Sequence, residues 1–252
     1  MLPLRPETQA LIQQLATLSG KPLEFMRDPG LSVLASLQIA RHGAPYHLLR
    51  YRPSNDPLDY IVAQQVGFVM RMFALPADLR VDFAATGAGE ESMQELICAS
   101  TLPFEADRAL LPEFAKQVHH WALMQVRSIP IGMRVDAWLY RDYESLRELQ
   151  ALGLASQQQM NANLLGQRMG GLSAPVAHLA PSAAFALFTD RLLSTQRYGI
   201  PFEAAGVMDE GRTLLEIFDA TPDDPAHDCA LVDRWADKLG MSGWYEWVSY
   251  KQ

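Results

Sequence analysis

The stretch that decides the expected fold runs Leu58-Asp-Tyr-Ile-Val-Ala-Gln64-Gln65-Val-Gly67-Phe68-Val-Met-Arg71-Met-Phe73. A cluster of proline and small polar residues, 53–57, precedes it, and Pro76 lies just past its end. Because such residues interrupt regular structure, they predict one helix over residues 58–73. The simplest interpretation is a buried amphipathic helix that carries two glutamines.

The same stretch has the frame of a zinc-binding helix. In the H-E-x-x-H motif, two histidines one turn apart bind the metal, and the glutamate between them acts as the base. The corresponding positions here are Gln64, Gln65 and Phe68, while Ala63 and Gly67 match an A-H-E-L-G-H helix. Neutral glutamine is a poor zinc ligand and cannot act as a base, and phenylalanine cannot bind metal. The helix therefore resembles a zincin helix that has lost its catalytic residues.

A second segment extends this resemblance. Residues 113–117, Glu-Phe-Ala-Lys-Gln, resemble the helix that supplies a third zinc ligand in ImmA/IrrE-like peptidases. That helix precedes a methionine-proline turn, where this chain reads Ser128-Ile129-Pro130. The resemblance covers about residues 58–130 and implies a zincin-like fold. The activity of the family does not carry over, because the ligands in the first helix are missing.

The order of predicted elements favours an α+β fold that is mainly helical, with a zincin-like core and a small sheet. We expect this core over residues 1–165 and a helical extension over 166–252, although one continuous domain remains an alternative. The Gly-rich segment 166–175 is the best linker, and 83–91 is expected to be a loop. Apolar periodicity predicts helices at 6–18, 31–41, 112–126, 131–140, 143–165, 182–197, 211–220 and 225–239, and strands at 22–26 and 46–51.

Composition excludes several classes of function. The net charge of −8 argues against general nucleic-acid binding, which needs clustered lysine and arginine. No apolar run approaches the roughly 18 residues of a membrane span, and the N-terminus does not resemble a signal peptide. Two distant cysteines, Cys98 and Cys229, make no disulfide framework and fit a reducing cytoplasm. We therefore expect a cytoplasmic protein with no membrane partner.

No pattern indicates a metal, a cofactor or a catalytic residue. His119 and His120 are adjacent, so they point about 100° apart on a helix and cannot chelate one ion, and one should face solvent. The other histidines have no ligand spacing. Cys98 resembles a small core residue, and Cys229 lacks the electropositive surroundings that activate a thiol.

Two groups of residues remain as binding candidates. Gln64, Gln65, Arg71 and Arg134 would line a cleft that binds a carboxylate or phosphate, unless the arginines only form structural ion pairs. Trp244, Tyr245, Trp247 and Tyr250 place four aromatics in the last nine residues. Such a segment either packs back on its own fold or docks on a partner.

The expected function is a catalytically inactive metallopeptidase-like protein that binds another macromolecule, most simply a protein. The family resemblance suggests a bacterial regulatory, defence or mobile-element context. One alternative is a small-ligand-binding enzyme that uses the cleft of glutamines and arginines. Another is a structural subunit of a larger assembly, anchored by the C-terminal aromatics. A homo-oligomer also stays open.

Overall fold

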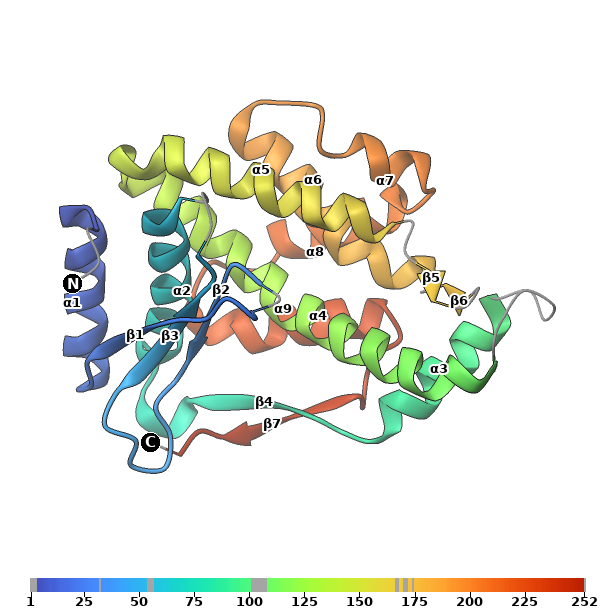
Figure 1. Cartoon of the computed structure of the whole chain (residues 1–252), viewed down its shortest axis with the longest axis horizontal. Helices are drawn as coiled ribbons and strands as arrows, with labels where there is room; N and C mark the ends of the chain where they lie inside the picture. Colours follow the sequence, from blue (N-terminus) through green and yellow to red (C-terminus); the bar gives the residue numbers. More distant parts are fainter. Residues whose placement is uncertain are drawn as a thin grey trace. The chain divides into compact units, whose positions relative to one another are not determined.

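The computed structural model describes residues 4–31, 33–53, 57–100, 108–165, 168–169, 172–173 and 175–251. Most of them are helical, with a small three-stranded sheet and two pairs of strands, and the C-terminal region is helical (Figure 1). The expectation of a mainly helical α+β fold is thus confirmed. None of the described helices is long and apolar enough to cross a membrane.

The described helices and strands alternate irregularly along the chain. The helices are α1 (Pro6–Ser19), α2 (Leu58–Phe73), α3 (Ala88–Ser100), α4 (Leu111–Asp142), α5 (Arg147–Leu164), α6 (Ala180–Leu193), α7 (Ile200–Ala204), α8 (Met208–Asp219) and α9 (Asp228–Lys238). The strands are β1 (Leu23–Arg27), β2 (Ala35–Gln38), β3 (His47–Tyr51), β4 (Val81–Ala85), β5 (Arg168–Met169), β6 (Leu172–Ser173) and β7 (Tyr245–Ser249).

The chain packs into two compact units, each made of separate segments. Unit 1 holds Met1–Asp82, Arg134–Gln157 and Val248–Gln252, and unit 2 holds Phe83–Met133 and Gln158–Trp247. These units are regions of dense internal packing. They do not show which parts of the chain fold independently. The expected domain boundary after residue 165 therefore stays a prediction.

Unit 1 contains the three-stranded sheet, in the order β1-β3-β2. β1 runs parallel to β3, with Leu23 opposite His47, and β2 runs antiparallel to it, with Ala35 opposite Tyr51. The expected strands at 22–26 and 46–51 are confirmed, but the expected helix at 31–41 is wrong, because 35–38 form β2. Pairing with β3 satisfies the backbone of this short segment, which overrides its weak helical periodicity.

The predicted helix over residues 58–73 is present as α2, and small residues let neighbouring helices approach it closely. A Cβ atom on Gly67 would lie 2.6 Å from Val135 Cγ1, on α4. A Cβ atom on Gly153, in α5, would lie 2.3 Å from Tyr60 Cδ1. These distances are shorter than real Cβ contacts, so the packing of α2 in unit 1 requires glycine at both positions.

Helix α4 differs from the expectation of two shorter helices. It runs from Leu111 to Asp142 with Pro130 inside it, so the expected interruption at 128–130 is wrong. Proline removes one hydrogen bond from a helix and crowds the preceding turn. Buried residues on both sides, Val126 and Ile131 among them, provide the packing that keeps the helix continuous.

Unit 2 contains α6 and α8 in close contact. A Cβ atom on Gly211 would lie 2.7 Å from Ala183 Cβ, and the rings of Phe188 and Phe218 meet edge to face at 5.9 Å. β4 and β7 pair as a two-stranded sheet, although they lie far apart in the sequence. The expected loop over 83–91 is therefore wrong at both ends, because it contains the end of β4 and the start of α3.

We predict that Gly153→Ala destabilises the protein by about 1–3 kcal/mol, although alanine is the better helix former. The buried Tyr60 ring cannot move away, because its hydroxyl donates to Asp136. Urea unfolding followed by circular dichroism measures the effect. The control is Gly87→Ala, where a Cβ atom would meet nothing within 4 Å. Equal stability of Gly153→Ala and wild type would contradict this packing.

Candidate functional site

The three residues of α2 at the positions that correspond to the H-E-x-x-H ligands and base are partly exposed. Gln64, Gln65 and Phe68 are each half-buried, and Gln65 Nε2 donates to Gln64 Oε1 at 2.9 Å. The two amides thus pair with each other. Neither supplies a base, since the amide group does not take up a proton near neutral pH.

The other candidate cleft residues have different surroundings. Arg134 is buried within unit 1, while Arg71 is half-buried near the end of α2. Gln64 and Arg71 lie seven residues apart, so they share one face of α2. That Gln64, Gln65, Arg71 and Arg134 line one ligand-binding cleft stays a prediction.

The segment expected to resemble a third-ligand helix begins α4 in unit 2. Glu113 is exposed there, and it accepts a hydrogen bond of 2.9 Å from Gln117 Nε2, one turn later. This is an ordinary pair on an exposed helix surface. α2 belongs to unit 1, so the two segments of the resemblance fall in different units.

The histidines lie in unlike surroundings. His119 is buried and His120 is exposed, which confirms that one of the pair faces solvent. His47 Nδ1 accepts a hydrogen bond of 3.0 Å from the Ala40 amide, and burial lowers its pKa. Burial lowers the pKa of His178 to about 4, so this ring is neutral at pH 7. Within the described part of the chain, no three His, Cys, Asp or Glu residues are grouped to hold a metal.

The two cysteines have different surroundings. Cys98 is exposed on α3, so its expected place in the core is wrong. The apolar residues Met93 and Ile97 take the buried positions of that helix instead. Cys229 is partly buried on α9, where burial and the nearby Asp233 and Asp228 raise its pKa to about 11. A thiol with a raised pKa is a weak nucleophile at neutral pH.

The C-terminal aromatic residues divide between the two units. In unit 2, Trp244 is buried, with the ring of His178 stacked at 5.6 Å and the ring of His119 at 5.4 Å. In unit 1, Tyr250 is buried. Of the two alternatives for this segment, packing back on its own fold holds for both of these residues.

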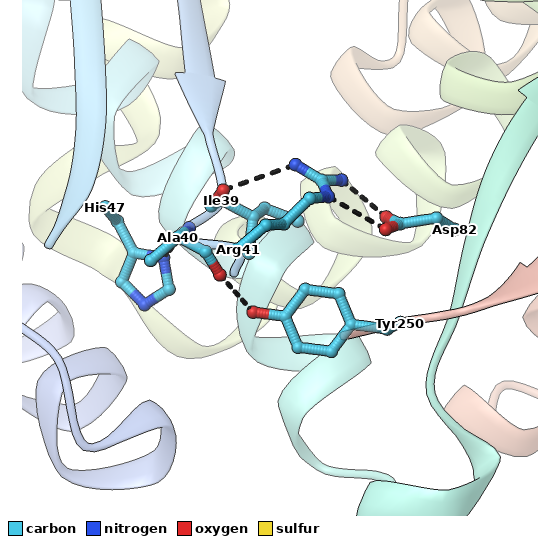
Figure 2. Close-up of polar contacts among 6 residues, drawn as sticks. All are labelled: Ile39, Ala40, Arg41, His47, Asp82 and Tyr250. Atoms are coloured by element: carbon cyan, nitrogen blue, oxygen red, sulfur yellow. Dashed lines mark hydrogen bonds and ion pairs between the residues drawn. The ribbon is translucent and has the colours of Figure 1, made fainter. Parts of the chain in front are cut away.

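Tyr250 belongs to a polar junction in unit 1 (Figure 2). Its hydroxyl donates to the Ala40 carbonyl, and its ring stands edge to face with Phe73 at 5.8 Å. Beside it, Arg41 Nε donates to Asp82 Oδ2 at 2.8 Å, and a second guanidinium nitrogen completes the two-pronged ion pair with the same carboxylate. Bidentate Arg–carboxylate pairs are strong and directional, so this ion pair holds the segment after β2 against Asp82 of β4. The hydroxyl of Tyr250 binds the same segment at Ala40.

Tyr245 and Trp247 form a different arrangement, with Phe83 of β4. The rings of Phe83 and Tyr245 stack at 4.2 Å, and Trp247 stands edge-on to Phe83 at 5.3 Å. Asp233 Oδ1, on α9, accepts hydrogen bonds from Tyr245 Oη at 2.6 Å and from Trp247 Nε1 at 2.8 Å. We call these four residues the ribbon cluster. All of them lie in unit 2 and are half-buried, so the rings are held in place and still partly exposed.

The charges around the ribbon cluster differ from ring to ring: Tyr245 lies near Asp233 and Asp237, whereas Phe83 lies near a guanidinium. Burial, the hydrogen bond to Asp233 and the charges of Asp233 and Asp237 together raise the pKa of Tyr245 well above its usual value. Tyr245 is therefore a neutral hydrogen-bond donor at neutral pH. Arg127 lies with its guanidinium carbon 5.9 Å from the centre of the Phe83 ring.

Sequence reasoning identified Tyr245 and Trp247 but missed Phe83 and Asp233. The alternation of Val81, Phe83 and Ala85 is the signal that could have indicated a strand, and it is followed at once by Thr86-Gly87-Ala88-Gly89, which favours a loop. Asp233 had no local signal, because its partners lie 12 and 14 residues later.

Comparisons with protein-family models, with curated proteins and with solved structures found no match for this chain.

We predict that Asp233→Ala lowers the pKa of Tyr245 toward its usual value, since the acceptor and its charge are both removed. Because two half-buried hydrogen bonds to a carboxylate are lost, stability should fall by about 1–3 kcal/mol. Tyrosinate absorbance during an alkaline titration measures the first effect. Asp237→Asn is the control, since Asp237 adds charge near Tyr245 but accepts no hydrogen bond from it. An unchanged titration in Asp233→Ala would contradict the assigned geometry.

Proposed function

We propose that this protein is a catalytically inactive, zincin-like protein that acts by binding another protein through the ribbon cluster. The observation that carries the proposal is the fixed, half-exposed stack of Phe83, Tyr245 and Trp247, with two of the rings hydrogen-bonded to one carboxylate. Tyrosine and tryptophan contribute strongly to protein interfaces because they combine apolar area with a polar group.

The rigidity of the cluster favours binding. A side chain that is mobile before binding loses conformational entropy when a partner immobilises it, at a cost of about 0.5–1.5 kcal/mol. Tyr245 and Trp247 have already lost much of this freedom, because Asp233 accepts a hydrogen bond from each. The cluster therefore presents aromatic surface that a partner can cover with little further ordering.

The charge of the cluster favours a protein over a nucleic acid. Exposed aromatic rings also bind single-stranded nucleic acids, but those sites combine the rings with a positively charged groove. Here the rings lie beside the carboxylates of Asp233 and Asp237, and the whole chain carries a net charge of −8. Phosphate groups would be repelled from this surface.

The proposal that the protein is inactive rests on the chemistry of α2. At the positions where a zincin has two histidines and a glutamate, this helix has two amides paired with each other and a phenyl ring. None of these groups can polarise a water molecule through a metal or accept its proton. The binding role that we propose instead belongs to the ribbon cluster, in unit 2.

We predict that a photo-crosslinking residue at Ala85 captures the partner and that one at Glu246 does not. Both positions are exposed, but Ala85 is two residues from Phe83, and Glu246 lies between Tyr245 and Trp247. Side chains alternate between the two faces of a strand, so Ala85 shares the face of the rings and Glu246 lies on the other face. Crosslinking in extracts of the native host, followed by mass spectrometry, identifies the partner.

The captured partner then allows a direct measurement. With the purified partner, Trp247→Ala and Phe83→Ala should each weaken binding at least tenfold, as is typical of aromatic residues at the centre of an interface. Glu246→Ala is the control on the same strand, and circular dichroism checks that each variant folds. Equal affinity for wild type and Phe83→Ala, a variant that removes no hydrogen bond with Asp233, would refute the proposed surface.

We predict that the purified untagged protein retains well under one zinc atom per chain after soaking, by elemental mass spectrometry. The triple variant Gln64→His, Gln65→Glu and Phe68→His should gain zinc binding, because residues 64 and 68 are one turn apart and half-exposed on α2. Zinc bound by wild type would refute the inactive reading. Failure of the folded triple variant to bind zinc would refute the proposal that α2 corresponds to a zincin helix.

A further inference from the structure

A carboxyl group lies at the centre of unit 1 with no exposure to solvent. Asp136, on α4, accepts a hydrogen bond at Oδ1 from the Tyr60 hydroxyl of α2 at 2.8 Å. Gln150 Nε2 of α5 donates to the Asp136 carbonyl at 2.9 Å and to Oδ1 at 3.3 Å. One aspartate thus joins three helices through hydrogen bonds.

This arrangement suits a neutral carboxyl group better than a carboxylate. Asp136 Oδ2 and Gln150 Oε1 are both buried, and neither has a hydrogen-bond donor among the residues that the structure describes. A buried carboxylate with one oxygen lacking a donor is costly, because the lost solvation is not replaced. A proton on Oδ2 removes the charge, and it converts an oxygen without a partner into a donor.

Within the described part of the chain, the groups that shift the pKa of Asp136 carry no positive charge. From α2 the facing titratable group is Tyr60, and from α5 the facing group is the neutral Gln150. On α5, Arg147 donates instead to the Tyr140 carbonyl, and Glu148 is exposed. Arg134 is buried on α4, yet no charged side chain is among the groups that shift the pKa of Asp136. Burial raises that pKa to about 7, against the hydrogen bonds from Tyr60 and Gln150, which lower it.

We propose that Asp136 is a proton-operated switch for the packing of α2 against α4 and α5. The protonated side chain holds the three helices together, and loss of the proton places a charge between them and loosens the packing. The Tyr60 ring is confined between Gly153 of α5 and its hydrogen bond to Asp136. The packing is therefore sensitive to a charge on Asp136, because Tyr60 has little room to adjust. This inference does not depend on the ribbon cluster or on the proposed protein partner.

The direction of the pH dependence follows from linkage. The pKa of Asp136 is raised from 3.8 in a free side chain to about 7 in the folded protein, so folding favours the bound proton. Its contribution to stability is present in full below about pH 4 and declines as the pH rises to about 7. Across this window the unfolding equilibrium constant should increase by up to about tenfold per pH unit, and above it the contribution stays constant.

The test is urea unfolding of the full chain at several pH values between about 5 and 8. Asp136→Asn is nearly isosteric and cannot ionise, so the wild-type unfolding constant divided by that of the variant should rise with pH up to about 7. Asp142→Asn, on the same helix but exposed, is the matched control and should give a ratio independent of pH in this range. A pH-independent ratio for Asp136→Asn would overturn the proposal.

A second measurement keeps the proposal testable if Asp136→Asn does not fold. Carboxyl ¹³C NMR of the wild-type protein should show one aspartate that titrates near pH 7, and native-state hydrogen exchange should show lower protection of α2 above that pH. Protection of α8, in unit 2, should be unaffected by this titration. Titration of every aspartate below about pH 5 would overturn the proposal.

Discussion

The hydrogen bond between the Tyr60 hydroxyl and Asp136 joins positions that are 76 residues apart, and the packing of unit 1 depends on it. It requires that α2, α4 and α5 approach closely, and Gly67 and Gly153 are the residues that permit this approach. Gln150 completes the polar centre from the third helix. A polar centre of this kind specifies one arrangement of helices, because displacement of any one of them leaves buried polar groups unpaired.

Residues near the C-terminus contribute to both units. Tyr250, just after β7, hydrogen-bonds to Ala40 in unit 1, beside the Arg41–Asp82 ion pair (Figure 2). Strand β7 itself contributes Tyr245 and Trp247 to the ribbon cluster in unit 2. Aromatic residues at a chain end are thus ordered by specific polar partners, a carbonyl in one unit and a carboxylate in the other. This ordering is what makes the half-exposed rings suitable for recognition.

The proposed function divides the chain into a part that would correspond to a lost active site and a part that would bind a partner. In that proposal α2 corresponds to a zinc-binding helix, and its Gln64 and Gln65 side chains hydrogen-bond to each other. The ribbon cluster lies in unit 2 and contains no residue of α2. The buried Asp136 adds a third element, a carboxyl group that joins α2, α4 and α5 through hydrogen bonds.

The sequence by itself determined the elements whose signals are local. The helix over 58–73, the strands near 22–26 and 46–51 and the C-terminal helices followed from periodicity and helix-breaking residues. The prediction that α2 lacks zincin chemistry also rests on residue types alone, since Gln64, Gln65 and Phe68 lack the required groups. The tertiary structure alone decided β2, the pairing of β4 with β7, the continuity of α4 through Pro130 and the partners of Asp136 and Asp233. The physical reason is that backbone pairing and burial are contributed by residues distant in the sequence, and no local pattern records which distant residue will supply them.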